Sequence, residues 1–283
     1  MEWRGGRQST HVDDRRMRRI PGGGRGLGVI GILMALVVAW MTGDPRALIG
    51  ALTGGSPAVA SDTSPPSAAE EEVADFMRTV LASTEDVWKT ELLKYGATYR
   101  EPTLVLFREA VESACGMQGA AVGPFYCPND EQLYLDLSFF EELERKLGAP
   151  GDFAQAYVIA HEVGHHLQHI LGTDREVRAA QERGGEASAN ELSVRLELQA
   201  DFYAGVWAHF ADRSGTKIER GDVEEALNAA AQIGDDNLQR RGQGRIVPES
   251  FTHGTSAQRV RWFKRGLESG DLRQGDTFAA GSL

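Results

Sequence analysis

The chain has 283 residues, a formal net charge of −11 and two cysteines. This length allows one sizeable domain with additional segments. The charge is unevenly distributed, because residues 1–26 carry a net charge of +4 and the remaining residues carry −15. An acidic body of this kind weighs against nucleic-acid binding, so no nucleic-acid partner is expected.

The first two segments resemble a membrane anchor. Residues 1–26 form a basic arm with seven arginines, and residues 27–43 are uncharged and largely apolar. The apolar run is at the lower limit of the roughly 17–25 residues that span a bilayer, and Trp40 suits the interface. The positive-inside rule then predicts a single-pass helix in the cytoplasmic membrane. The basic arm is expected in the cytoplasm, and the rest of the chain outside it.

Two other interpretations of the apolar run are weaker. A cleaved signal peptide is one, since Ala58-Val59-Ala60 resembles a cleavage site, but it lies far beyond the apolar run. A buried helix of a soluble domain is the other, but the run has no polar face. We therefore expect a retained anchor.

The remainder divides into a linker and one domain. Residues 44–69 become rich in Ser, Pro, Gly and Ala and predict a flexible tether. Residues 70–283 are expected to form an α+β, mostly helical domain with a small sheet. The expected elements are helices over 70–95, from 138 and over 222–240, strands over 103–107 and 132–137, and a polar loop over 174–187.

Cys115 and Cys127 are expected to form a disulfide, because a domain outside the cytoplasm is in an oxidising compartment. The glycines and the proline between them allow a closed loop. Two buried thiols are the alternative. A zinc site at these cysteines is not expected, since the histidines lie elsewhere.

The strongest chemical signal is the sequence His161-Glu162-Val163-Gly164-His165, which reads H-E-x-x-H within a helical run. Residues four apart share a face of a helix, so both imidazoles can reach one Zn²⁺ ion. Glu162 then lies where a carboxylate can accept a proton from a zinc-bound water. Gly164 is expected to leave room beside the metal. A motif with three fixed letters also occurs by chance, so the third ligand decides the interpretation.

Glu197 is the expected third ligand. Metzincins would place a histidine at position 171, where this chain has Leu171. His166 and His169 lie about 140° and 80° around the helix from His161, so we expect them on its surface or in supporting hydrogen bonds.

Glu197 and Asp201 are four apart on an otherwise apolar helical face, where unpaired acids are costly. We expect Asp201 to bond a ligand imidazole. Two solvated acids are the alternative, which suits Glu191 better.

These motifs resemble those of the bacterial neutral zinc metallopeptidases of the YpfJ type. The resemblance covers nearly the whole chain and rests on H-E-V-G-H-H-x-Q from 161, E-L-Q-A-D-x-x-A-G-V-W-A from 197 and T-H-G-T-S-x-Q-R-V-x-W-F from 252, with segments 3–9, 12–16, 113–116 and 123–128. It implies a gluzincin-like protease fold and peptidase chemistry, with no particular substrate.

His253 is the last candidate, at a glycine-containing turn before a helix. It is expected to stabilise the oxyanion, and a capping role in the loop is the alternative.

The expected function is that of a membrane-anchored zinc peptidase acting on peptides or proteins. A zinc-containing binding or scaffold protein of the cell envelope is the rival. Residues 134–137 are assigned, as a candidate edge strand, to pairing with the substrate backbone, and an ordinary sheet strand is the alternative.

Overall fold

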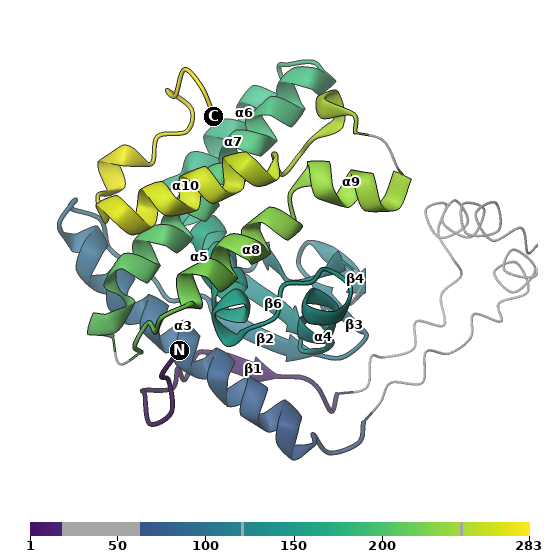
Figure 1. The fold of residues 1–283 in the computed structure, drawn as a ribbon, viewed down its shortest axis with the longest axis vertical. Helices are drawn as coiled ribbons and strands as arrows, with labels where there is room; N and C mark the ends of the chain where they lie inside the picture. The colour runs from purple at the N-terminus through teal and green to yellow at the C-terminus, as the bar shows by residue number, and fades with distance from the viewer. Residues whose placement is uncertain (19–62, 120–121, 215, 244–245) are drawn as a thin grey trace, which may run out of the picture.

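The computed structural model describes residues 1–18, 63–119, 122–214, 216–243 and 246–283. Helices make up most of this part of the chain, and a small sheet lies on one side of the helical body (Figure 1). The expected α+β, mostly helical class is therefore confirmed for these residues.

Four strands of the described residues form one sheet, in the order β1 (Val12–Asp14), β2 (Thr103–Phe107), β6 (Gln132–Asp136) and β5 (Phe125–Cys127). The first three run parallel, whereas β5 is antiparallel to β6. The expected strands over 103–107 and 132–137 are confirmed. Tyr134 pairs with both Val105 and Phe125, whereas Leu135 and Asp136 pair with β2 alone, and β5 is the outermost strand. The expectation of an edge strand over residues 134–137 is therefore wrong for Tyr134, which is paired on both sides.

The two faces of the sheet cover different cores, as the period of two in a strand requires. Leu104, Leu106, Leu133 and Leu135 pack in the main core with the helices. The residues that alternate with them, Val105, Phe107 and Tyr134, face the other side of the sheet. They pack in a smaller core beside the hairpin of β3 (Ala110–Ser113) and β4 (Gly116–Gly119). The disulfide between Cys115 and Cys127 is present and joins the turn of this hairpin to the end of β5.

The N-terminal residues belong to the folded domain. Strand β1 pairs with β2, and the N-terminal amine of Met1 is 2.9 Å from the carboxylate of Asp152. Arg16 is 2% exposed and bonds to Asp14 and Glu71. The expectation that residues 1–18 are part of a separate cytoplasmic arm is therefore wrong.

The same contacts contradict the single-pass topology. Segments that hydrogen-bond to each other lie on one side of a membrane, so residues 1–18 cannot be cytoplasmic while the domain is outside. Among the described residues, no helix combines the length and apolar character that a membrane crossing requires. The predicted anchor over 27–43 and most of the predicted linker lie outside the described residues.

The helices of the described residues surround the main core, with α3 running along the sheet (Figure 1). Their bounds are α3 Ala68–Leu93, α4 Ser138–Arg145, α5 Asp152–Leu171, α6 Thr173–Gln181, α7 Glu186–Phe210, α8 Asp222–Gln232, α9 Asp235–Gln243 and α10 Ser256–Ser269. Three short 3₁₀ turns complete them, at Ala211–Arg213, Pro248–Ser250 and Leu272–Gln274.

Three of these bounds differ from expectation. Ser67 caps α3 in a capping box with Glu70, so the domain resumes before residue 70. The expected loop over 174–187 contains helix α6. The expected helix over 222–240 is two helices, because the chain turns at Gly234 where the backbone of Ser256 approaches too closely for a side chain.

Glycines allow helices α5, α7 and α10 to pack with their backbones in contact. A Cβ atom on Gly164 of α5 would lie 2.9 Å from the Cα and carbonyl oxygen of Ala200 in α7. A Cβ atom on Gly205 of α7 would lie 2.0 Å from the carbonyl oxygen of Phe263 in α10. The absence of a side chain therefore sets the spacing of the three helices that carry the candidate site.

Candidate metal centre

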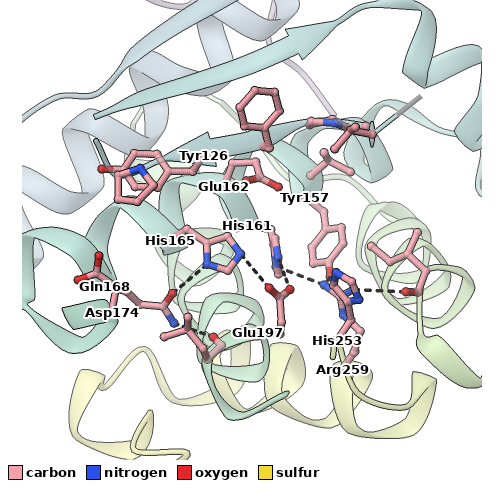
Figure 2. A pocket seen from close by; sticks show the side chains of 18 of the residues that line it. Tyr126, Tyr157, His161, Glu162, His165, Gln168, Asp174, Glu197, His253 and Arg259 are labelled. Carbon is pink, nitrogen blue, oxygen red and sulfur yellow. Dashed lines mark hydrogen bonds and ion pairs between the residues drawn. The ribbon is translucent and has the colours of Figure 1, made fainter. Parts of the chain in front are cut away.

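Helix α5 presents His161 and His165 on one face, and helix α7 brings Glu197 against them (Figure 2). His161 Nε2 lies 3.2 Å from Glu197 Oε2, and His165 Nε2 lies 3.5 Å from Glu197 Oε1. One ligand atom from each of the three residues lies within 4.8 Å of the others. Two imidazoles and one carboxylate form a donor set that fits a zinc ion with an open fourth position.

Asp201 orients His161. Asp201 Oδ1 lies 2.9 Å from His161 Nδ1, so the imidazole donates from Nδ1 and its Nε2 would face a metal. The hydroxyl of Tyr157 donates to the same carboxylate oxygen at 2.5 Å. Asp201 and Tyr157 are both fully buried, so these bonds are shielded from water.

Gln168 orients His165 in the same way. His165 Nδ1 lies 2.9 Å from Gln168 Oε1, which accepts the Nδ1 proton when Nε2 faces the metal. Gln168 Nε2 donates to the carbonyl oxygen of Leu196 at 2.6 Å. The support of His165 is therefore tied to the helix turn that carries Glu197.

The charges at the centre suit a cation. Burial raises the pKa of Glu197, but His165 and His161 outweigh this effect and hold the pKa well below its usual value. Burial lowers the pKa of His161, and Asp201 overcomes this and raises it to about 9. The centre therefore holds a carboxylate beside the imidazole of His161, whose Nε2 proton a metal would replace.

Glu162 lines the same cleft and is 9% exposed. Burial raises the pKa of its carboxyl group above the usual value. Within the described part of the chain, its carboxylate makes no hydrogen bond, so both oxygens are available to a molecule in the cleft. A carboxylate with these properties can accept and return a proton.

His253 reaches the cleft from the turn before α10, and Asp235 at the start of α9 holds that turn. Asp235 Oδ2 accepts hydrogen bonds from the backbone amides of Thr252, His253 and Gly254. Asp235 Oδ1 lies 3.2 Å from His253 Nδ1. Asp235 therefore fixes the Nδ1 side of the imidazole, and Nε2 lies on the opposite side of the ring.

The cleft that contains these residues has a volume of about 550 Å³. One wall is formed by residues 122–126, which lie within the loop closed by the disulfide. Apolar residues also line it, namely Pro128, Phe139, Val158, Leu196, Ile233 and Leu238, together with Tyr157, Gln168 and the charged residues Asp174, Arg178 and Arg259.

The remaining histidines of α5 are not brought to the candidate centre. His166 is buried, with Nε2 2.6 Å from the carbonyl oxygen of Arg100 and Nδ1 3.0 Å from the hydroxyl of Tyr126. Burial lowers the pKa of His166 to about 4, so it links α5 to β5 as a neutral group. His169 pairs with Asp174 at 2.8 Å.

Four residues of the site received no role from the sequence: Tyr157, Gln168, Asp235 and Arg259. The sequence contained a signal for the first two, because Tyr157 precedes His161 by four residues and Gln168 follows His165 by three. These spacings place each residue on the same helix face as the histidine that it supports. Arg259 and Asp235 come from later helices, so only the tertiary structure brings them to the centre.

Comparisons with known proteins identify the family of this chain. A family model described as "Putative neutral zinc metallopeptidase" matches residues 1–278. Uncharacterized protein YpfJ of Escherichia coli strain K12 is 48% identical over 289 residues, which cover 98% of this chain and 99% of YpfJ. An uncharacterized protein of Mycobacterium tuberculosis strain H37Rv is 42% identical over 211 residues, covering 71% of this chain and 69% of its own. No solved structure matches significantly. A match over almost the whole length shows that the chain belongs to this zinc metallopeptidase family.

Proposed function

We propose that the protein is a zinc-dependent peptidase that hydrolyses peptide bonds with water. The observation that carries the proposal is the convergence of His161, His165 and Glu197 in an open cleft that Glu162 also lines. Catalytic zinc centres use three protein ligands and leave a position for water or substrate. Family membership supports the same chemistry.

Glu162 has the central role in the proposed reaction. Zinc, held by the two imidazoles and Glu197, supplies Lewis-acid chemistry when bound. The Glu162 carboxylate accepts a proton from the attacking water as the water oxygen bonds to the peptide carbonyl carbon. Glu162 then donates that proton to the amide nitrogen as the carbon–nitrogen bond breaks. Burial raises the pKa of Glu162, which favours its holding the proton between the two steps.

His253 would donate a hydrogen bond from Nε2 to the carbonyl oxygen as negative charge develops there. Its Nδ1 faces Asp235, which favours a protonated ring with Nε2 free to donate. The turn is held by three further bonds to Asp235, so the donor is fixed before substrate binds.

Strand β5 supports a peptide as the substrate. It forms the edge of the sheet, and its residues Phe125 and Tyr126 line the cleft. An extended peptide can pair with the free side of an edge strand, which binds many sequences through the backbone. This role, first assigned to residues 134–137, therefore moves to β5.

The rival function is a binding or scaffold protein that keeps zinc as a structural element. A structural zinc site is closed by four protein ligands. Here the cluster has three members, and Glu162 lies in the cleft with them. This difference favours the peptidase.

The test is hydrolysis of an unfolded protein such as casein by the full chain and its Glu162→Gln variant. An amide cannot accept the proton, so we expect Glu162→Gln to bind about one equivalent of zinc and to lose nearly all hydrolysis. A chelator should inhibit the wild type, and added zinc should restore it. Full activity of Glu162→Gln would refute the mechanism.

The metal arm of this experiment uses two glutamates of helix α7. Glu197→Gln removes a proposed ligand and should lose most of the bound zinc. Glu191→Gln is the matched control, since Glu191 is exposed and pairs with Arg195. Loss of zinc in the control with retention in Glu197→Gln would show that the ligand set is wrong.

A further inference from the structure

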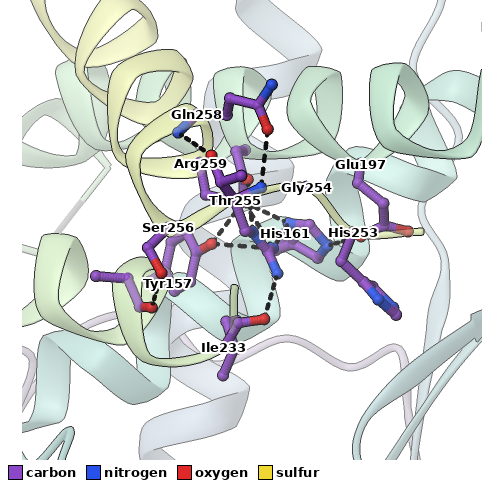
Figure 3. A network of polar contacts seen from close by, with 12 residues as sticks. Tyr157, His161, Glu197, Ile233, His253, Gly254, Thr255, Ser256, Gln258 and Arg259 are labelled. Atoms are coloured by element: carbon purple, nitrogen blue, oxygen red, sulfur yellow. Dashed lines mark hydrogen bonds and ion pairs between the residues drawn. The ribbon is translucent and has the colours of Figure 1, made fainter. Parts of the chain in front are cut away.

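Arg259 is a buried cation next to the candidate centre. It lies on α10, where Thr255 and Gln258 form a capping box (Figure 3). Only 2% of Arg259 is exposed. Arg261 and Lys264 on the same helix are exposed. Burying a guanidinium is costly unless it is paired, so the surroundings of Arg259 show what it does.

The partner of Arg259 is Asp201. Arg259 Nε donates to Asp201 Oδ2 at 2.8 Å, and Nη2 donates to Asp201 Oδ1 at 2.9 Å. Two parallel bonds of this kind fix the plane of a carboxylate as well as its position. Nη2 also donates to the hydroxyl of Tyr157 at 3.2 Å. It lies 3.3 Å from His161 Nδ1, but Nδ1 donates its proton to Asp201 and so does not accept from Arg259. Asp201 is therefore held by groups from α5 and α10.

The fixed carboxylate in turn sets the direction of His161. Asp201 Oδ1 accepts from His161 Nδ1 at 2.9 Å, and His161 Nε2 then faces Glu197. A rotation of the carboxylate would take Oδ1 out of line with the imidazole. We propose that Arg259 is a positioning residue of the metal centre, acting through Asp201 to hold His161 ready for zinc. This inference rests on the proposed zinc site.

A structural role is the competing explanation, because Arg259 also joins α10 to its neighbours. Its Nη1 lies 3.5 Å from the carbonyl oxygen of Ile233, and Asp201 belongs to α7. If Arg259 served only to attach α10, its loss would lower stability and leave the zinc affinity of the folded protein unchanged. Zinc affinity and stability must therefore be measured separately.

The experiment measures the zinc Kd of the full chain by competition with a chromogenic chelator, and the melting temperature without metal. The variants are Arg259→Met, Asp201→Asn and the double substitution, with Arg261→Met as the exposed control on the same helix. We expect Arg259→Met to weaken zinc binding about 10- to 100-fold, the usual scale for residues that orient ligands. Arg261→Met should leave the Kd unchanged.

The double substitution tests whether Arg259 acts on His161 through Asp201. If Arg259 acts through Asp201, the double variant should bind zinc no more weakly than Asp201→Asn, whereas independent effects would multiply. If Arg259→Met does not fold, Arg259→Lys takes its place. It keeps the charge but loses the two-point contact, so we expect about 10-fold weaker zinc binding.

Two results for the variants would overturn the inference: an unchanged Kd in folded Arg259→Met with a lower melting temperature, or multiplying losses in the double variant. Neither result depends on hydrolysis. Zinc binding by the wild type without hydrolysis would refute the peptidase proposal alone. A wild type that binds no zinc would overturn both.

Discussion

The imidazole of His253 is half-exposed and bonds through Nδ1 to Asp235. That bond raises the pKa of His253 above its usual value near 6.5. The protonated form therefore persists to a higher pH than it does for a free imidazole, and it is lost as the pH rises through the raised pKa of the folded protein. Since only this form has both nitrogens as donors, activity should fall on the alkaline side.

We expect His253→Ala to lower kcat about 10²- to 10³-fold, the scale of losing one oxyanion donor. The variant should also lack the alkaline fall that His253 causes. The measurement is kcat against pH together with zinc content, which should not change. His209→Ala is the control, because His209 lies at the end of α7 and bonds to the carbonyl oxygen of Leu267 on α10. Normal kcat with a lower melting temperature would leave His253 only a structural role in its turn.

At the scale of helices, the contact between α5 and α7 sets the distance from His161 and His165 to Glu197. An Ala side chain at Gly164 would lie 2.9 Å from the backbone of Ala200, so the helices would have to separate. We expect Gly164→Ala to lower the free energy of unfolding by about 1–3 kcal/mol, as overpacking does, and to weaken zinc binding. Denaturant unfolding and a zinc titration measure the two effects.

The control for this prediction is Gly185→Ala at the start of α7. A Cβ atom at Gly185 would have no other atom within 4 Å, so the helix need not move. Its zinc Kd should equal that of the wild type. If Gly164→Ala also keeps the wild-type Kd, the spacing of the two helices does not limit metal binding.

The sequence could predict what lies within one helix. The spacing of His161 and His165 predicted a shared face, and the acids at 197 and 201 predicted a second one, because four residues are about one helical turn. Contacts between helices could not be predicted in this way. Gly164 was expected to leave room for a metal, but its missing side chain admits Ala200 instead. Arg259 could be seen only once α10 was packed against α7.

At the scale of the whole molecule, the arginines near the N-terminus show why a membrane topology predicted from composition disagrees with the structure. Seven arginines before an apolar run are typical of a cytoplasmic flank. In the structure, Arg7 bonds to Glu85 and Asp86, and Arg16 bonds to Glu71, all on α3. Composition gives the charge of a segment but not its partner, which lies more than fifty residues away.

The contacts of residues 1–18 with the domain predict that both lie on the same side of any membrane. Gln8 and Glu268 are exposed on the two parts, so each can carry a single cysteine substitution. The native cysteines are joined in a disulfide, so the wild type should not react with a maleimide. Disulfides persist in oxidising compartments, and we therefore expect an impermeant maleimide to label both Gln8→Cys and Glu268→Cys in intact cells. Permeabilised cells control for the reactivity of each site. Labelling of Glu268→Cys alone would restore the single-pass topology, and would require residues 1–18 to leave the sheet.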